Sequence, residues 1–90
     1  MALELKEVAA GLGFPEGPVA LSDGSLLYVD IQQETLARVA ADGKSAPVTV
    51  ASLPGGPNGA AIGPDGAAYV CNNGGVYLCA RDERTGMMTP

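Results

Sequence analysis

The sequence contains no histidine or tryptophan, and only one phenylalanine, three tyrosines and five basic residues in 90. Without histidine there is no Ser-His-Asp or Cys-His nucleophile, no histidine zinc ligand and no side chain that ordinarily titrates near neutral pH. No apolar run approaches the about 20 residues that cross a bilayer, and acidic residues stand where a signal peptide has its apolar core. We therefore expect a cytoplasmic protein.

Cysteine is also scarce, with Cys71 and Cys79 as the two thiols. Two thiols alone cannot close a tetrahedral zinc site, and their spacing fits no CxxC pattern. If residues 73–74 form a two-residue hairpin turn, Cys71 pairs with Val76 and Cys79 with Ala68, which places the two thiols on opposite faces of the sheet. We expect both thiols to be free and both to be buried as small apolar side chains.

Ten acidic residues outnumber the five basic ones and give a formal net charge of −5. This charge repels phosphate backbones and anionic lipid headgroups, and the basic residues form no stripe along the sequence. We therefore expect neither nucleic acid nor a membrane as a partner. The 47% hydrophobic content is that of a folded chain, and the length allows one small domain or part of a larger one.

Turn sequences divide the chain at short intervals. Asp-Gly or Asn-Gly pairs, in which glycine supplies the positive φ of tight hairpin turns, stand at residues 23–24, 42–43, 65–66 and 73–74. Runs typical of short strands lie at residues 18–21, 26–31, 36–40, 48–51, 59–62, 68–71 and 76–79. The run at 36–40 also fits a helical turn, and residues 3–10 fit a helix or a half-buried strand. The sequence predicts an all-β meander, with residues 1–13 as a lead-in strand.

An internal repeat organises these strands. Glu16-Gly17 recurs as Asn58-Gly59, and Asp23-Gly24 recurs as Asp65-Gly66, both at an offset of 42. Tyr28-Val29 recurs as Tyr69-Val70 at an offset of 41, which we interpret as the loss of one residue from the turn. A period near 42 with four short strands per repeat is typical of β-propeller blades. The alternative is a single meander whose turns coincide by chance.

The repeat predicts a fold of antiparallel four-stranded meander blades, about two blades of an incomplete β-propeller. The first blade extends over about residues 14–53 and the second over about 57–90, with a weak or missing fourth strand. Propellers close with typically four to eight blades, since closure protects the sheet edges. Two blades leave edges open, so that we expect either assembly of several copies or a chain that is part of a longer protein.

Three segments resemble one family. They are Phe-Pro-Glu-Gly-Pro at 14–18, Leu-Leu-Tyr-Val-Asp-Ile at 26–31, and the run from Gly-Pro-Asn-Gly to Pro-Asp-Gly at 56–66. They are similar to the gluconolactonase family, which includes the regucalcins (senescence marker proteins), and residues 70–75 are similar to its bacterial members. The resemblance implies that these residues form the first third of a six-bladed propeller.

The resemblance also implies metal-dependent hydrolysis of a small lactone. In the family one divalent cation, calcium or zinc with magnesium or manganese tolerated, lies on the propeller axis. Glu16 matches the glutamate that the first blade contributes as a metal ligand. Asn58 and Asn73 are expected as substrate-pocket residues or outer metal contacts. The remaining ligands and the general base match no residue of this sequence, so we expect the chain alone to be inactive.

The residues themselves agree with this chemistry. Equivalent positions of successive blades converge near the axis, so Glu16 and Asn58 are expected to face one cavity. A carboxylate with amide oxygens suits Ca²⁺, Mg²⁺ or Mn²⁺ and is workable for Zn²⁺. The alternative is that Glu16 is a solvated acidic residue in the loop before a strand. Asp30 is either a turn acid or a hydrogen-bond acceptor between blades, and Asn72 and Asn73 are most simply hairpin residues.

Two functions from different classes remain open. The first is the N-terminal part of a gluconolactonase-like hydrolase. The second is a non-enzymatic propeller module that self-assembles or binds partners through exposed strand edges. Three copies with two blades each would bring three Glu16 carboxylates around one axis.

Overall fold

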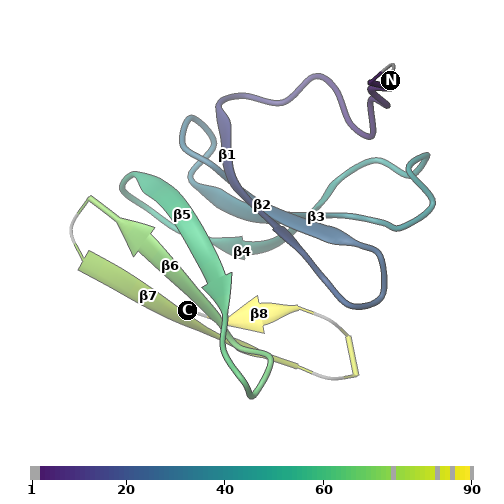
Figure 1. Ribbon diagram of the computed structural model, residues 1–90. Helices are drawn as coiled ribbons and strands as arrows, with labels where there is room; N and C mark the ends of the chain where they lie inside the picture. The colour runs from purple at the N-terminus through teal and green to yellow at the C-terminus, as the bar shows by residue number, and fades with distance from the viewer. Residues whose placement is uncertain (1–2, 74, 83, 86, 90) are drawn as a thin grey trace.

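Eight antiparallel strands form two four-stranded sheets in this computed structural model, which describes residues 3–73, 75–82, 84–85 and 87–89. Each sheet is a meander in which every strand pairs with the next along the chain, as Figure 1 shows. The first sheet contains β1 (Pro15–Ala20), β2 (Leu26–Asp30), β3 (Thr35–Val39) and β4 (Val48–Ser52). The second contains β5 (Pro57–Ile62), β6 (Ala68–Asn72), β7 (Gly75–Arg81) and β8 (Met88–Thr89). The predicted all-β meander is confirmed, and residues 35–39 form a strand rather than a helical turn.

One face of each sheet packs against the other sheet. Leu27, Val29 and Leu36 on the first sheet and Ala68, Val70 and Cys79 on the second belong to one buried cluster. The residues facing each other are of unequal size, and the small ones on the second sheet allow the strands to approach. Burial of this apolar surface is the main stabilising contribution to the packing of one sheet on the other.

In the turns at Asp23 and Asp65 the aspartate accepts a hydrogen bond from the backbone N–H two residues further on. The Asp23 carboxylate accepts from the Ser25 backbone N–H at 2.8 Å, and Asp65 accepts from Ala67 N–H at 3.1 Å. Asp42 accepts in the same way from Lys44 N–H at 2.8 Å. All three aspartates are therefore turn residues, as their Asp-Gly sequences predict.

The second strands of the two sheets align at an offset of 42 throughout, which corrects the predicted offset of 41. Asp30, the last residue of β2, pairs with Pro15, and Asn72, the last residue of β6, pairs with Pro57. Tyr28 thus corresponds to Val70 and not to Tyr69. No residue is lost from the turn; the length difference lies in the next hairpin, where Asp30 pairs with Thr35 but Asn72 pairs with Gly75.

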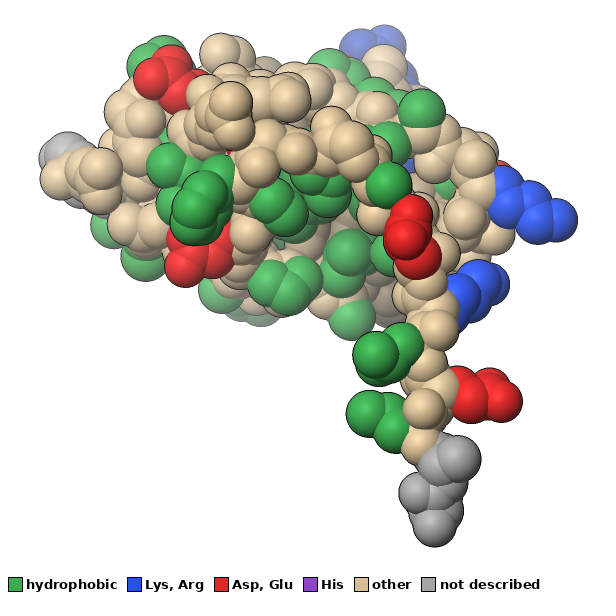
Figure 2. Space-filling model, turned by 90° about the horizontal axis from the view of Figure 1, so that it is seen from above, with side chains coloured by type: hydrophobic (Ala, Val, Ile, Leu, Met, Phe, Trp, Pro, Cys, Tyr) green, Lys and Arg blue, Asp and Glu red, His purple; other side chains and the backbone are tan. Residues whose placement is uncertain are grey.

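The expected lead-in strand is wrong for the described residues 3–12, which form no strand. Among the described residues, no strand lies alongside this segment to accept and donate its backbone hydrogen bonds, so the alternation of Leu3 and Leu5 buries neither side chain. Ala9 and Leu12 nevertheless pack on the outer face of the first sheet, against a cluster that contains Tyr28 and Val39. The first part of the chain extends away from the sheets in Figure 2.

The two cysteines follow the predicted register but differ in burial. Cys71 pairs with Val76 and Cys79 with Ala68, and both thiols are free. Cys79 faces the first sheet and is buried, as expected, whereas Cys71 faces away from it and is exposed, which corrects the expectation that both are buried. The cause is the open outer face of the second sheet.

Candidate functional site

The first strands of the two sheets approach each other closely near their beginnings. A Cβ atom on Gly17, in β1, would lie 2.8 Å from the Cα atom of Gly59, in β5. Gly17 also has a φ of 60°, a left-handed conformation that strains other residues. Position 17 therefore requires glycine, whereas a Cβ on Gly59 would meet nothing within 4 Å.

Glu16 and Asn58 immediately precede these two glycines. The structure thus brings the predicted ligand position and the predicted pocket position to the same end of neighbouring strands, and both side chains are exposed. Within the described part of the chain, the Glu16 carboxylate has no hydrogen bond and no ion pair. Both of its oxygens are therefore available to a cation or to solvent.

Asn73 lies beside Asn58 at this end of the second sheet. The Asn58 side-chain N–H donates a hydrogen bond to the Asn73 Oδ1 atom at 3.4 Å. Asn73 is itself held by its backbone N–H, which donates to the Gly56 carbonyl at 3.2 Å, and its amide would collide with a Cβ on Gly56. The hairpin residue Asn73, which directly follows β6, therefore also orients Asn58.

A repeated clasp holds the chain that enters each first strand. Asp30 accepts hydrogen bonds from the backbone N–H groups of Gly13 and Phe14, both at 2.9 Å. At the equivalent place in the second sheet, Asn72 accepts from Gly56 N–H at 3.2 Å and donates to the Pro54 carbonyl at 3.2 Å. The clasps fix the segments that precede Glu16 and Asn58.

Asp30 also accepts from Gln33 N–H at 3.0 Å, so its predicted role as a turn acid is confirmed. Its other contacts reach the entering segment of the same sheet, and the alternative of an acceptor between blades is wrong. Burial opposes ionisation of this carboxyl, but the surrounding backbone N–H groups, led by that of Phe14, outweigh it and lower the pKa of Asp30.

Sequence reasoning missed the clasp, although a signal was present. Gly-x-Pro-x-Gly occurs at residues 13–17 and again at 55–59, at the same offset of 42 that relates Asp30 to Asn72. A Cβ on Gly13 would lie 2.7 Å from an Asp30 carboxylate oxygen, and Gly55 has a similar contact with Asn72. The first glycine of each motif therefore leaves space for the Asp30 or Asn72 side chain that holds the entering segment.

The donor atoms at this end form part of a set for a hard cation. Glu16 contributes a carboxylate, and Asn58 contributes an amide oxygen for which the described residues provide no partner. Calcium, magnesium and manganese prefer such oxygen ligands. Among the described residues there is no group of three or more Asp, Glu, Cys or His that could hold a metal ion.

The described residues include no helix long and apolar enough to cross a membrane. No curated protein sequence matches the chain. A solved structure that is similar is the PQQ-bound form of an aldose sugar dehydrogenase from Streptomyces coelicolor, with a TM-score of 0.77 and 24% sequence identity. The alignment covers 94% of this chain and 31% of the dehydrogenase chain. The dehydrogenase is a β-propeller protein, and at this identity the likeness shows the fold alone.

The two sheets are therefore two blades of a β-propeller, as the repeat predicts. The family model described as the SMP-30/gluconolactonase/LRE-like region matches residues 14–90. This match begins one residue before β1 and covers both blades. The resemblance found in the sequence is thereby confirmed: the chain belongs to the SMP-30/gluconolactonase/LRE-like family.

Proposed function

We propose that this chain forms the first two blades of a metal-dependent lactone hydrolase, in which Glu16 is a ligand of the divalent cation. The observation that carries the proposal is the contact between Gly17 and Gly59, which places Glu16 and Asn58 side by side at the beginnings of neighbouring inner strands. The family match supports the same activity, since family members usually bind a metal.

The chain's own residues would supply charge and orientation. The Glu16 carboxylate is exposed and unpaired within the described residues, so it can bind a cation without first breaking an ion pair. The Asn58 amide, which donates one N–H to Asn73, would donate its other N–H to a hydroxyl or carbonyl oxygen of a small lactone. A bound divalent ion would polarise the lactone carbonyl and lower the pKa of a bound water.

The remaining ligands and the general base would come from other blades. Calcium takes about six to eight oxygen ligands, and the chain offers one carboxylate with the neighbouring amide oxygens. We therefore expect the 90-residue chain with added Ca²⁺ or Zn²⁺ to hydrolyse lactones no faster than the metal alone. Clear metal-dependent turnover by the pure chain would contradict this assignment.

Replacing the first two blades of an active lactonase of this family with residues 14–90 tests the proposal directly. We expect the folded chimera to keep metal-dependent lactone hydrolysis and to lose it in Glu16→Gln. Glu34→Gln is the matched control, because Glu34 is an exposed acid in the turn between β2 and β3. A folded chimera whose turnover is unchanged by Glu16→Gln would overturn the role of Glu16.

A second candidate is self-assembly, because the outer face of the second blade is apolar and open. Its exposed residues on β6 and β7 are Tyr69, Cys71, Val76 and Leu78. The opposite face of the first blade carries the cluster of Tyr28, Ala37 and Val39. A second copy that repeats the rotation between the blades would bring these two faces together, and three copies would make a ring with one metal ion per three chains.

A further inference from the structure

A cleft lies between the two blades at the end opposite to Glu16. It has a volume of about 640 Å³ and opens between the turns that follow β1 and β5. Its apolar lining includes Leu21, Leu27, Ile62 and Met88. The volume is in the range of small-molecule sites, and the walls come from both blades.

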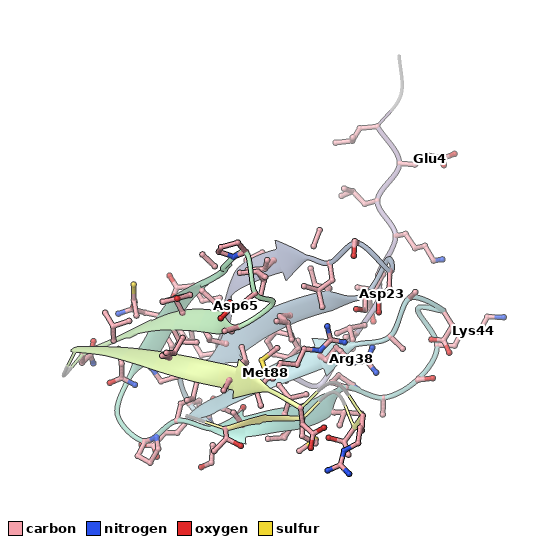
Figure 3. The ribbon with its side chains drawn as sticks, turned by 90° about the horizontal axis from the view of Figure 1, so that it is seen from below. Glu4, Asp23, Arg38, Lys44, Asp65 and Met88 are labelled. Atoms are coloured by element: carbon pink, nitrogen blue, oxygen red, sulfur yellow. The ribbon has the colours of Figure 1, made fainter. Side chains whose placement is uncertain are left out.

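Two arginines, one from each blade, line this cleft. Arg38 lies on β3 opposite Leu27 of β2, and Arg81 lies at the end of β7 opposite Met88 of β8. Figure 3 shows the Arg38 side chain between Met88 and Asp23. Arg38 is half-buried and Arg81 is exposed. Within the described residues neither guanidinium has a hydrogen bond or an ion pair, so their N–H donors are available.

The charge of the cleft is opposite to that of the chain. Three of the five basic residues line it, whereas the chain as a whole carries −5. Arg84 is already engaged, at 3.6 Å from Asp82. The carboxylate at the rim, Asp23, accepts hydrogen bonds from both the N–H and the hydroxyl of Ser25 and forms no salt bridge with Arg38 or Arg81. The Ser25 hydrogen bonds lower the pKa of Asp23, and the charges of Arg38 and Arg81 lower it further.

We propose that this cleft binds a small organic anion, with a carboxylate or phosphate group between Arg38 and Arg81 and an apolar body against Leu27, Ile62 and Met88. The planar guanidinium group matches the geometry of both oxyanions and binds them through two hydrogen bonds. This site is at the other end of β1 from Glu16. The proposed anion binding is therefore independent of the proposed lactone hydrolysis and is tested separately.

Calorimetric titration of the chain with octanoate, octyl phosphate and octanol tests the site. Octanoate and octyl phosphate present the two head groups, and octanol has the apolar body without the charge. We expect saturable 1:1 binding of at least one anion, weakening as salt is raised because part of the site is exposed, and no binding of octanol. The stronger of the two anions identifies the preferred head group.

The variants Arg38→Gln and Arg81→Gln distinguish binding in this cleft from non-specific electrostatic attraction of the anion to the chain. Each is expected to raise the dissociation constant at least about tenfold, the loss of one hydrogen bond to a charged group. Lys44→Gln removes the same charge from an exposed turn outside the cleft and should change nothing. Because Arg81 is exposed, we expect its variant to fold. Absence of binding to the folded chain, or binding that survives in both arginine variants, would overturn the proposal.

Discussion

Asp30 and Asn72 occupy equivalent positions in the two blades but make different hydrogen bonds there. Asp30 is an acceptor alone, and three of its hydrogen bonds come from the N–H groups of Gly13, Phe14 and Gln33. Asn72 accepts from Gly56 and donates to Pro54. The two side chains are therefore not interchangeable, because an amide nitrogen in place of either Asp30 oxygen would meet a backbone N–H donor.

Exchanging the first clasp residue tests this difference. In Asp30→Asn the amide nitrogen would face at least one backbone N–H donor at a site that is 2% exposed. We expect the free energy of unfolding to fall by about 1–3 kcal/mol, the cost of an unsatisfied buried donor. Urea denaturation measures it. Asp42→Asn, at an exposed turn, is the control and should cost less; equal losses in both variants would contradict the clasp.

The acid sensitivity of the chain follows from its aspartates. The Ser25 hydroxyl lowers the pKa of Asp23, and the backbone N–H groups of Lys44 and then Ser45 lower the pKa of Asp42 to about 2. Asp30 is lowered as well, from a usual value of 3.8. A carboxyl with a depressed pKa in the folded state stabilises the fold above its unfolded value, and this contribution is lost as the pH falls through the folded value.

We therefore expect the urea midpoint to fall from about pH 4 downward and to continue falling toward about pH 2. Denaturation at a series of pH values measures it, and Asp42→Asn should flatten the lowest part of the curve. A midpoint that rises, or stays constant, as the pH is lowered through this window would contradict the hydrogen-bonding assigned to these carboxyls.

At the scale of the strands, the approach of β1 to β5 depends on one glycine of the pair. Gly17→Ala adds a Cβ 2.8 Å from the Gly59 Cα atom and a side chain at a φ of 60°. We expect the free energy of unfolding to fall by about 2 kcal/mol or more, since strain and overpacking add. Chemical denaturation gives the value.

Gly59→Ala is the matched control, because its Cβ would meet nothing within 4 Å. We expect it to cost less than about 1 kcal/mol. If the two alanine variants are equally stable, the strands do not pack as closely as the contact between Gly17 and Gly59 requires.

Strand positions and turns were predictable from sequence because they depend on local chemistry. Asp-Gly pairs determine the turns at 23–24 and 65–66, and the Asn-Gly sequence at 73–74 predicts the pairing of Cys71 with Val76 that the structure has. The predicted offset of 41 was wrong because Tyr69-Val70 has the same residues as Tyr28-Val29 but does not occupy the equivalent strand positions. The pairing of Asn72 with Pro57 fixes the register of β6 and so determines which of its side chains face the first blade. This pairing is a long-range contact.

The candidate site was predictable only in part. The repeat places Glu16 and Asn58 at equivalent positions, and the structure brings them together at the starts of β1 and β5. The hydrogen bond between Asn58 and Asn73 joins residues 15 positions apart, and no local sequence pattern predicts it. Arg38 and Arg81 meet in one cleft because two blades pack, which their sequence neighbours do not indicate.

At the scale of the whole molecule, we expect the open face of the second blade to control association. Leu78 on this face and Val48 on β4 are both 51% exposed. We expect light scattering on a size-exclusion column to give masses above 9.0 kDa for the concentrated chain, because burial of apolar side chains favours association. Leu78→Glu should restore the single-chain mass, whereas Val48→Glu should not.

Alkylation of Cys71 provides a second measurement, since this exposed thiol lies on the same face and should react more slowly in the associated form. Cys79 is buried between the blades, where burial raises the pKa of its thiol, and should stay protected in both forms. A single-chain mass at every concentration, or equal effects of Leu78→Glu and Val48→Glu, would contradict association through this face.

The most direct test of the site is a titration of the isotope-labelled chain with Mn²⁺, followed by NMR. Paramagnetic broadening detects weak binding, as expected for an incomplete ligand set. We expect the signals of Gly17, Gly59 and the Asn58 side-chain amide to broaden first, and we expect Glu16→Gln but not Glu34→Gln to abolish this broadening. Broadening that is confined to other acidic turns, or that persists unchanged in Glu16→Gln, would contradict a metal site at the blade starts.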